Sequence, residues 1–272
     1  NDMMNYKLLV LDLDGTLTDS KKKITAHTHD TLIEAQRQGV RIVLASGRPT
    51  YGVAPIADAL ELDRYEGYIL SYNGGEIIDW KTKELMYKKW LDDDVLPYLY
   101  QCAKDNGFAI VTYDHEYVLT ELPDDEYVLK EALLNVMKIK KVDNFLAAIP
   151  RPITKCLIVG EPTRLAELEK KMYEQLKDKM GVFRSEPYFL ELVPKGIDKA
   201  QSLSVLLKEI GLTQEEMIAM GDGFNDLSMI QYAGLGIAMA NAQQVVRDNA
   251  DFITLSNDED GVAYAVKKFI LS

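Results

Sequence analysis

Short apolar runs that alternate with helical patterns restrict the fold of this chain more than any other feature. In the N-terminal part, apolar runs at 7–11, 40–45 and 68–71 are separated by predicted helices at 25–39 and 51–60. Each run has the length of a strand and ends at a polar loop. Strands and helices in this alternation are typical of a parallel sheet with helices on both faces.

The alternation returns near the C-terminus, whereas the middle of the chain has another pattern. C-terminal strand-like runs lie at 217–220, 236–239 and 252–254, between helical patterns at 198–210, 226–233, 243–249 and 261–271. In the middle, strand-like runs lie at 84–90, 108–113, 117–121, 155–159 and 188–193, with helical patterns at 94–105, 125–137 and 163–180. The close pair 108–113 and 117–121 predicts a hairpin and an antiparallel sheet. We therefore predict an α/β protein with a Rossmann-like parallel-sheet core (1–82 and 190–272) and an inserted α+β domain (83–189).

Charge and composition narrow the range of partners. The formal net charge of −12 repels nucleic acid and anionic membrane surfaces, so neither is expected as a partner. No apolar run reaches the length of about 18 residues that spans a bilayer, and the start of the chain lacks the pattern of a signal peptide. Two cysteines, Cys102 and Cys156, are too few for a disulfide framework. We expect a cytoplasmic protein with free thiols.

Carboxylates follow two of the predicted strands of the core. The segment Asp12-Leu13-Asp14-Gly15-Thr16 comes directly after the first strand, and Gly221-Asp222-Gly223-Phe224-Asn225-Asp226 follows the strand at 217–220. Ligands of open α/β sheets bind at the carboxyl ends of the strands. Asp12, Asp14 and Asp222 would repel one another there without a cation, and Mg²⁺ prefers such ligands. The alternative is a pair of acidic turns, since Asp, Asn and Gly form turns readily.

Two further segments carry groups suited to phosphate. Ser46-Gly47-Arg48 ends the second strand and is predicted to open a helix, where a hydroxyl and free backbone N–H groups cradle phosphate; Ser46 serves equally as a helix cap. Lys199 begins a helix, where a positive charge is unfavourable, so a partner carboxylate or phosphate is indicated. A solvated lysine is the alternative, and Lys195 is a competing candidate. The basic run at 21–23 is predicted to be a solvated loop.

The order of these four segments resembles the haloacid dehalogenase superfamily, and within it the Cof-type sugar-phosphatase branch. The branch has a class IIB cap domain, also called C2-type, between the second and third motifs, and the inserted segment matches that cap in size and position. Ser71-Tyr72-Asn73-Gly74-Gly75 also resembles a segment of the branch. The resemblance covers essentially the whole chain.

The resemblance implies a role for each matching residue. Asp12 would attack phosphorus and carry the phosphoryl group, and Asp14 would act as general acid and then as general base. Mg²⁺ would be held by the Asp12 carboxylate, the Asp14 backbone carbonyl and the Asp222 carboxylate, with Asp226 supporting these ligands. The phosphate-binding residues would be Leu13, Ser46, Gly47, Lys199 and Asn225. Arg48 and Asn73 are candidates for contact with the substrate or the cap.

The resemblance also implies an activity. We expect a magnesium-dependent phosphatase of small phosphorylated metabolites, sugar phosphates above all, because a large cap excludes macromolecules. A monomer is expected. Two alternatives stay open: a phosphomutase, which returns the phosphate to the substrate, and a catalytically silent binding or regulatory protein on the same fold.

Overall fold

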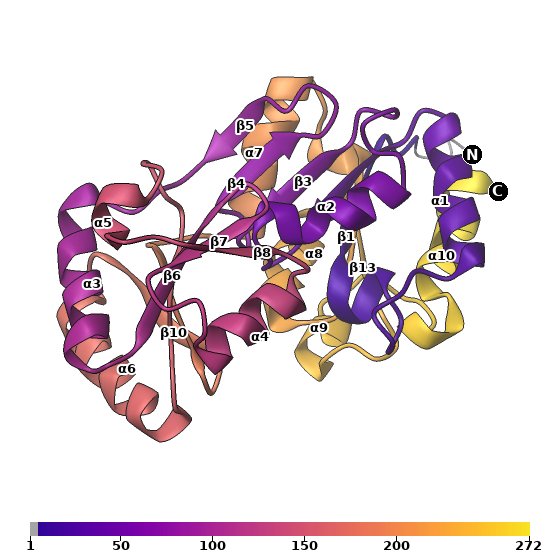
Figure 1. Ribbon diagram of the computed structural model, residues 1–272. Helices are drawn as coiled ribbons and strands as arrows, with labels where there is room; N and C mark the ends of the chain where they lie inside the picture. Colours follow the sequence, from indigo (N-terminus) through magenta and orange to yellow (C-terminus); the bar gives the residue numbers. More distant parts are fainter. Residues whose placement is uncertain (1–4) are drawn as a thin grey trace. The chain divides into compact units, whose positions relative to one another are not determined.

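The computed structural model describes residues 5–272, which divide into two compact units. The first unit comprises residues 5–48, 53–87 and 198–272, and the second comprises 49–52 and 88–197. Residues 1–4, which begin the predicted core segment 1–82, lie outside the described part of the chain. Each unit is built on its own sheet (Figure 1).

The sheet of the first unit has eight strands in the order β14-β13-β12-β1-β2-β3-β4-β5. The strands are β1 (Leu8–Asp12), β2 (Arg41–Ala45), β3 (Tyr68–Ser71), β4 (Glu76–Asp79), β5 (Leu85–Lys88), β12 (Met217–Gly221), β13 (Leu235–Ala238) and β14 (Phe252–Ile253). Pairing is parallel from β14 to β3 and antiparallel between β3 and β4. All five residues of β1 are buried, as expected for an inner parallel strand. The predicted α/β fold with a parallel-sheet core is confirmed.

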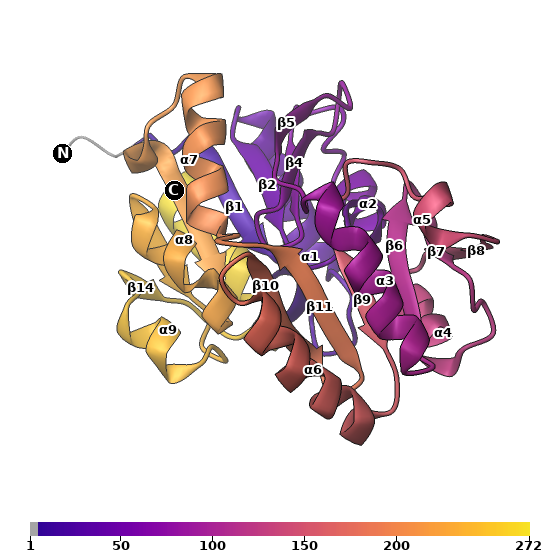
Figure 2. The ribbon, with the colours of Figure 1, turned by 90° about the vertical axis from the view of Figure 1, so that its left-hand side faces the viewer.

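Helices cover both faces of this sheet. They are α1 (Ala26–Arg37), α2 (Thr50–Ala59), α7 (Lys199–Ile210), α8 (Leu227–Tyr232), α9 (Gln244–Asp248) and α10 (Gly261–Val266), with single turns η1 (Leu13–Leu17), η3 (Gln214–Glu216), η4 (Phe224–Asp226), η5 (Asn257–Glu259) and η6 (Lys267–Leu271). On one face, Leu203 and Leu206 of α7 share a core with Val10 of β1. Figure 2 shows α7 and α8 together on that side. The Thr25 hydroxyl accepts a hydrogen bond from the Thr28 amide and so caps α1, as predicted.

The sheet of the second unit has six strands in the order β10-β11-β9-β6-β7-β8. The strands are β6 (Ala109–Asp114), β7 (Tyr117–Thr120), β8 (Lys138–Lys141), β9 (Cys156–Val159), β10 (Met180–Glu186) and β11 (Phe189–Pro194). Pairing is antiparallel except between β7 and β8, and the predicted hairpin is β6–β7. The helices are η2 (Asp93–Val95), α3 (Leu96–Asp105), α4 (Glu126–Leu134), α5 (Phe145–Ala148) and α6 (Pro162–Leu176). Figure 2 shows α3 and α6 over one face of the sheet, where they enclose an apolar core.

The observed units differ from the expected boundaries of 83 and 189 by several residues. β5 pairs at the edge of the first sheet, and β11 lies inside the second sheet, so the main segment of the second unit runs from Lys88 to Ile197. A strand's own residues do not reveal which sheet accepts it, because the partner strands are distant in sequence. That the inserted unit is a separately folding domain stays a prediction. Among residues 5–272, no helix is long and apolar enough to cross a bilayer.

Candidate active site

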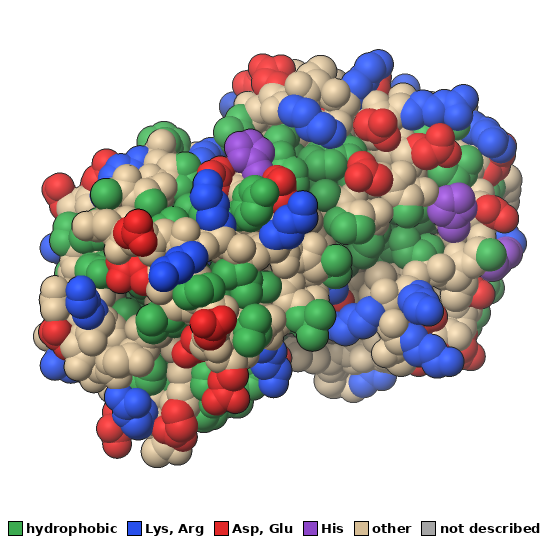
Figure 3. Space-filling view, viewed as in Figure 1, with side chains coloured by type: hydrophobic (Ala, Val, Ile, Leu, Met, Phe, Trp, Pro, Cys, Tyr) green, Lys and Arg blue, Asp and Glu red, His purple; other side chains and the backbone are tan. Residues whose placement is uncertain are grey.

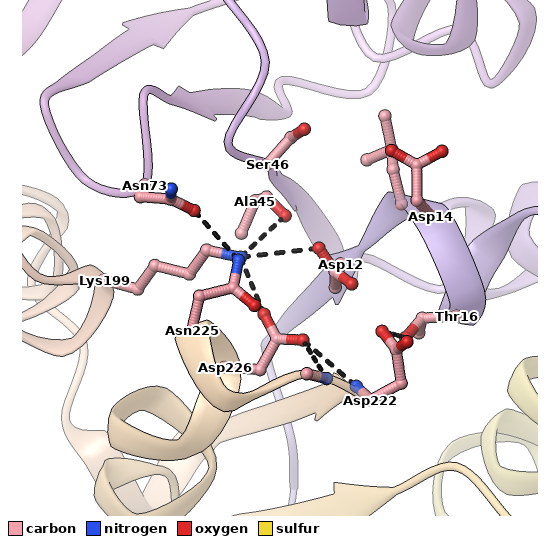
Figure 4. A network of polar contacts seen from close by, with 12 residues as sticks. Asp12, Asp14, Thr16, Ala45, Ser46, Asn73, Lys199, Asp222, Asn225 and Asp226 are labelled. Carbon is pink, nitrogen blue, oxygen red and sulfur yellow. Dashed lines mark hydrogen bonds and ion pairs between the residues drawn. The ribbon is translucent and has the colours of Figure 1, made fainter. Parts of the chain in front are cut away.

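The carboxyl ends of β1, β2 and β12 bring together the predicted acidic and polar residues of the first unit. Asp12 is the last residue of β1 and is 7% exposed. Its carboxylate lies beside those of Asp222 and Asp226, and one oxygen from each of the three lies within 4.8 Å of the others (Figure 4). The strand-end rule therefore placed Asp12 and Asp222 correctly at one sheet edge.

Lys199 points into this cluster from the first residue of α7. Its side chain is fully buried, and Nζ donates to Asp226 Oδ1 at 2.7 Å, to the Ala45 carbonyl at 3.3 Å and to Asp12 Oδ1 at 3.4 Å. Burial by itself would lower the pKa of Lys199, but the Asp226 and Asp12 carboxylates outweigh it and raise the pKa. The competing candidate, Lys195, is exposed and donates to the Asp178 carbonyl in the second unit.

Asp226 is the residue that joins the lysine to the loop after β12. It is fully buried, and its Oδ2 accepts hydrogen bonds from the amides of Asp222 (3.0 Å) and Gly223 (3.1 Å) while Oδ1 takes the Lys199 ammonium. Both oxygens thus have protein donors. The arrangement fits the predicted supporting role, in which Asp226 holds the backbone on which Asp222 is carried.

The surroundings of Asp12 and Asp222 disfavour the ionised form of both carboxyl groups. Burial and the neighbouring Asp226 carboxylate raise the pKa of Asp12 well above its ordinary value, although Lys199 acts in the opposite direction. Burial likewise raises the pKa of Asp222. One ammonium does not compensate three clustered carboxylates. Oxygen ligands with excess negative charge suit a hard divalent cation such as Mg²⁺, so the residues present fit the expected metal.

Asp14 faces a different group of side chains. Figure 4 shows its carboxylate apart from the Asp12 cluster. Arg48 binds it with two nitrogens, Nη2 to Oδ1 at 2.7 Å and Nε to Oδ2 at 3.2 Å, and Lys22 Nζ lies 3.0 Å from Oδ1. Burial would raise the pKa of Asp14, but Arg48 and Lys22 together lower it. Asp14 is therefore held as a carboxylate in this arrangement.

The segment after β2 departs from the prediction in one respect. We expected residues 46–48 to open a helix, but α2 begins only at Thr50. Pro49 follows Arg48, and the residue before a proline is disfavoured in helical conformation. Ser46 is 2% exposed, and its hydroxyl accepts from the Arg48 amide at 3.0 Å, so it stabilises a local turn instead of capping a helix.

Asn225, Gly47 and Asn73 border the same sheet edge, whereas Leu13 could contribute only its backbone amide. Asn225 Nδ2 donates to Asn73 Oδ1 at 2.9 Å, and a Cβ on Gly47 would lie 3.0 Å from the Asn73 side chain. Asn73 itself has a left-handed backbone, φ 57°. Leu13 has a buried side chain, so any contact with phosphate would come from its amide.

The comparison with known families identifies the chain. Residues 9–266 match the sequence model of the haloacid dehalogenase-like hydrolases. This chain belongs to that family. A crystal structure of a haloacid dehalogenase-like hydrolase from Bacteroides thetaiotaomicron is 57% identical, covers 97% of this chain and 99% of its own, and superposes with a TM-score of 0.94.

Two more relatives of this hydrolase bear on its enzyme class. Phosphatase YwpJ of Bacillus subtilis is 32% identical over 97% of this chain and 100% of its own length. A solved structure described as the subclass IIB sugar phosphatase BT4131 is 25% identical, with a TM-score of 0.75 over 97% of this chain and 98% of its own. These likenesses support the predicted Cof-type branch and the predicted enzyme class, a phosphatase.

Three residues of the hydrolase's site were not predicted. Thr16 donates to Asp222 Oδ1 at 3.1 Å, and Asn241 Nδ2 donates to the Gly15 carbonyl at 2.9 Å, so both fix the turn after β1. Lys22 was predicted to lie in a solvated loop, and its side chain is 59% exposed, but its ion pair with Asp14 was not predicted. Thr16 lies inside the first motif, which was a usable signal. Neither Asn241 nor Lys22 stands in a pattern that points to the site.

Proposed function

We propose that this hydrolase removes phosphate from small phosphorylated metabolites, sugar phosphates above all, in a Mg²⁺-dependent reaction through a phospho-aspartate on Asp12. The observation that carries the proposal is the buried Asp12 carboxylate within reach of the Lys199 ammonium, at the sheet edge that also carries Ser46 and Asp222. A nucleophilic carboxylate beside a buried cation is suited to phosphoryl transfer, which depends mainly on positioning and charge neutralisation.

The residues of this chain would divide the reaction into two steps. An Asp12 oxygen attacks phosphorus, and the bond from phosphorus to the ester oxygen breaks. The leaving oxygen takes a proton from Asp14, which must first leave Arg48 and Lys22 and take up that proton from solvent, because both cations hold it as a carboxylate in the structure. Water then attacks the phosphorus of the phospho-aspartate and gives its proton to Asp14. The bond from phosphorus to the Asp12 oxygen breaks, so inorganic phosphate is released and the Asp12 carboxylate is restored. Lys199, Ser46, Asn225 and the amides of Leu13 and Gly47 would hold the phosphoryl oxygens.

The metal would be held by oxygen atoms of residues at the ends of β1 and β12. The carboxylates of Asp12 and Asp222 and the backbone carbonyl of Asp14 are the proposed ligands, and Asp226 would hold the Asp222 backbone behind them. Bound Mg²⁺ supplies positive charge against the phosphoryl oxygens and the clustered carboxylates. Asp226 is the less suitable ligand, since Lys199 and two amides already occupy its oxygens.

Small metabolites are the favoured substrate class for two reasons. The relative BT4131 is described as a sugar phosphatase, and the inserted unit matches the size of a cap. On the face shown in Figure 3, acidic and basic side chains are interspersed over the surface, which offers no broad basic area for nucleic acid. A cytoplasmic location is part of the proposal and agrees with the free thiols of Cys102 and Cys156.

Phosphate release from a panel of sugar, polyol and nucleotide phosphates, measured with Mg²⁺ and with EDTA, tests the proposal. We expect turnover only with Mg²⁺, and we expect Asp12→Asn to reduce it by about a thousandfold or more. Asp63→Asn is the matched control, because Asp63 is an exposed aspartate of the same unit, and it should keep the wild-type rate. Full Mg²⁺-dependent turnover by Asp12→Asn would refute the phospho-aspartate. Transfer of phosphate within the substrate, without free phosphate, would indicate a phosphomutase.

A thermal melt tests the metal site without turnover. Mg²⁺ at a hundred times its dissociation constant should raise the free energy of unfolding by about 2.7 kcal/mol, because it binds only the folded chain. Asp222→Asn should lose most of this gain, and Asp63→Asn should keep it. An equal gain in all three proteins would place the Mg²⁺ elsewhere.

A further inference from the structure

The loop that carries Lys22 is a tightly bonded turn. Asp19 closes it, because its amide donates to the Lys23 carbonyl at 2.8 Å and its Oδ1 accepts from the amides of Lys21 (2.9 Å) and Lys23 (3.0 Å). Ser20 ties the turn to η5, donating to Asp258 through its amide at 2.8 Å and its hydroxyl at 2.5 Å. These hydrogen bonds therefore fix the backbone position of Lys22.

Lys22 has an unfavourable backbone conformation at the tip of this turn. Its φ is 62°, in the left-handed region where a residue with a Cβ is strained. Such strain concentrates at functional sites. Among the described residues, the Lys22 ammonium makes one side-chain contact, to Asp14 Oδ1 at 3.0 Å, and its side chain is 59% exposed. An ammonium has three donors, so two face solvent.

Stabilisation of Asp14 does not explain why Lys22 is there. Arg48 already contacts both carboxylate oxygens of Asp14, and its side chain is only 16% exposed. Exposed ion pairs such as Lys22–Asp14 add little to stability. Lys22 and Arg48 therefore both contact the Asp14 carboxylate, and Lys22 is the more exposed of the two.

We infer that Lys22 binds a carboxylate of the substrate, so that the preferred substrates are phosphomonoesters of sugar acids or hydroxy acids. When Asp14 turns to the leaving oxygen, Lys22 loses its carboxylate partner, and a substrate carboxylate of the same charge replaces it. The two solvent-facing N–H groups of Lys22 suit this ligand, since hydrogen bonds between an ammonium and a carboxylate are strong. The inference rests on the proposed phosphatase function and narrows its substrate class.

Substrate pairs that differ only in a carboxylate test the inference. 3-Phosphoglycerate is compared with glycerol 3-phosphate, and 6-phosphogluconate with glucitol 6-phosphate, by kcat/KM. We expect the wild type to prefer the acid in at least one pair. Lys22→Met should lower the ratio of acid to polyol in that pair by about tenfold, the effect of one hydrogen bond to a charged group. Lys22→Arg should keep most of the preference, and higher salt should reduce it.

Lys21→Met is the matched control, because Lys21 lies in the same turn and is exposed. It should leave the ratio unchanged, and the melting temperatures of the two Met variants should agree. An equal fall of kcat/KM for acid and polyol in Lys22→Met would show that Lys22 acts on Asp14 alone and would overturn the inference. No effect on either substrate would overturn it as well. A wild-type protein that turns over none of the four esters, nor p-nitrophenyl phosphate, would instead refute the phosphatase function itself.

Discussion

At the scale of single residues, Lys199 has the most unusual environment in the site. A fully buried ammonium is costly unless carboxylates and hydrogen bonds compensate it, and Asp226, Asp12 and the Ala45 carbonyl provide that compensation. The same contacts hold Nζ beside the proposed nucleophile. Lys199 therefore couples the stability of the first unit to the geometry of the reaction.

Lys199→Met should destabilise the protein and remove activity. The carboxylates of Asp12 and Asp226 would remain buried without their cation, so the free energy of unfolding should fall by about 3 kcal/mol. Chemical denaturation measures this. Lys208→Met, an exposed lysine at the other end of α7, should change stability little. Lys199→Met/Asp226→Asn should recover part of the stability but none of the activity, and equal stabilities of the single and double variants would contradict this account.

At the scale of elements, the turn η1 after β1 decides how Asp12 and Asp14 diverge. Gly15 has φ 80°, and its Cα lies so close to Asp222 that a Cβ would clash with the carboxylate. Asn241 holds the Gly15 carbonyl at 2.9 Å, and Asn257 holds the Thr18 carbonyl at 3.0 Å. Backbone conformation and packing thus jointly require glycine here.

Gly15→Ala and Gly39→Ala form a matched pair for this turn. Gly39 also has a positive φ, 98°, but has open space around its Cα. Gly39→Ala should lower the free energy of unfolding by about 1 kcal/mol and keep activity, since only backbone strain is added. Gly15→Ala should lower the free energy of unfolding by more than Gly39→Ala does. It should also weaken Mg²⁺ binding and turnover, because the new Cβ would displace the Asp222 carboxylate. Equal effects of the two substitutions on turnover would show that Asp222 is not held by this turn.

The site residues at strand ends could be predicted from the sequence, whereas those in loops could not. Asp12 ends a strand and Ser46 and Asp222 follow strands, and adjacent parallel strands end at one edge, so local pattern was sufficient to group them. Lys22 could not be found in this way. Its position depends on a left-handed φ and on the contact between Ser20 and Asp258, which are 238 residues apart in the chain. The strands β4, β8 and β10 were also missed. β8 and β10 are edge strands that carry charged residues, and the apolar run of β4 is only two residues long.

At the scale of the whole molecule, the second unit carries a buried ionic cluster of its own. Glu131 is 4% exposed and accepts hydrogen bonds from Tyr113 (2.9 Å) and Asn135 (2.8 Å). Lys155 pairs with Glu191 at 3.1 Å. Burial raises the pKa of Glu131, Lys155 counteracts this, and Glu191 adds to it. The folded chain therefore holds the Glu131 proton more tightly than the unfolded chain does.

This raised pKa gives a stability effect with a defined sign. Below the ordinary value of 4.5, Glu131 is protonated in both states and adds no penalty. As the pH rises above 4.5, the unfolded chain ionises first, and the folded state loses stability until Glu131 ionises there too. Glu131→Gln should thus be more stable than the wild type at neutral pH, with a difference that disappears in acid. Urea melts across this range measure it, with Glu167→Gln, exposed on α6, as the control. A difference that is constant with pH would contradict the raised pKa.

The sequence by itself determined the order of the parallel strands and their helices in the core, the α/β class of the core and the group of polar residues at the strand ends. These features depend on local periodicity and on the fact that adjacent parallel strands end at the same edge of a sheet. Only the tertiary structure decided that β5 joins the first sheet and that Lys22 faces Asp14. Each of these outcomes depends on contacts between residues distant in the chain or on backbone conformations such as a left-handed φ, and neither leaves a periodic mark in the sequence.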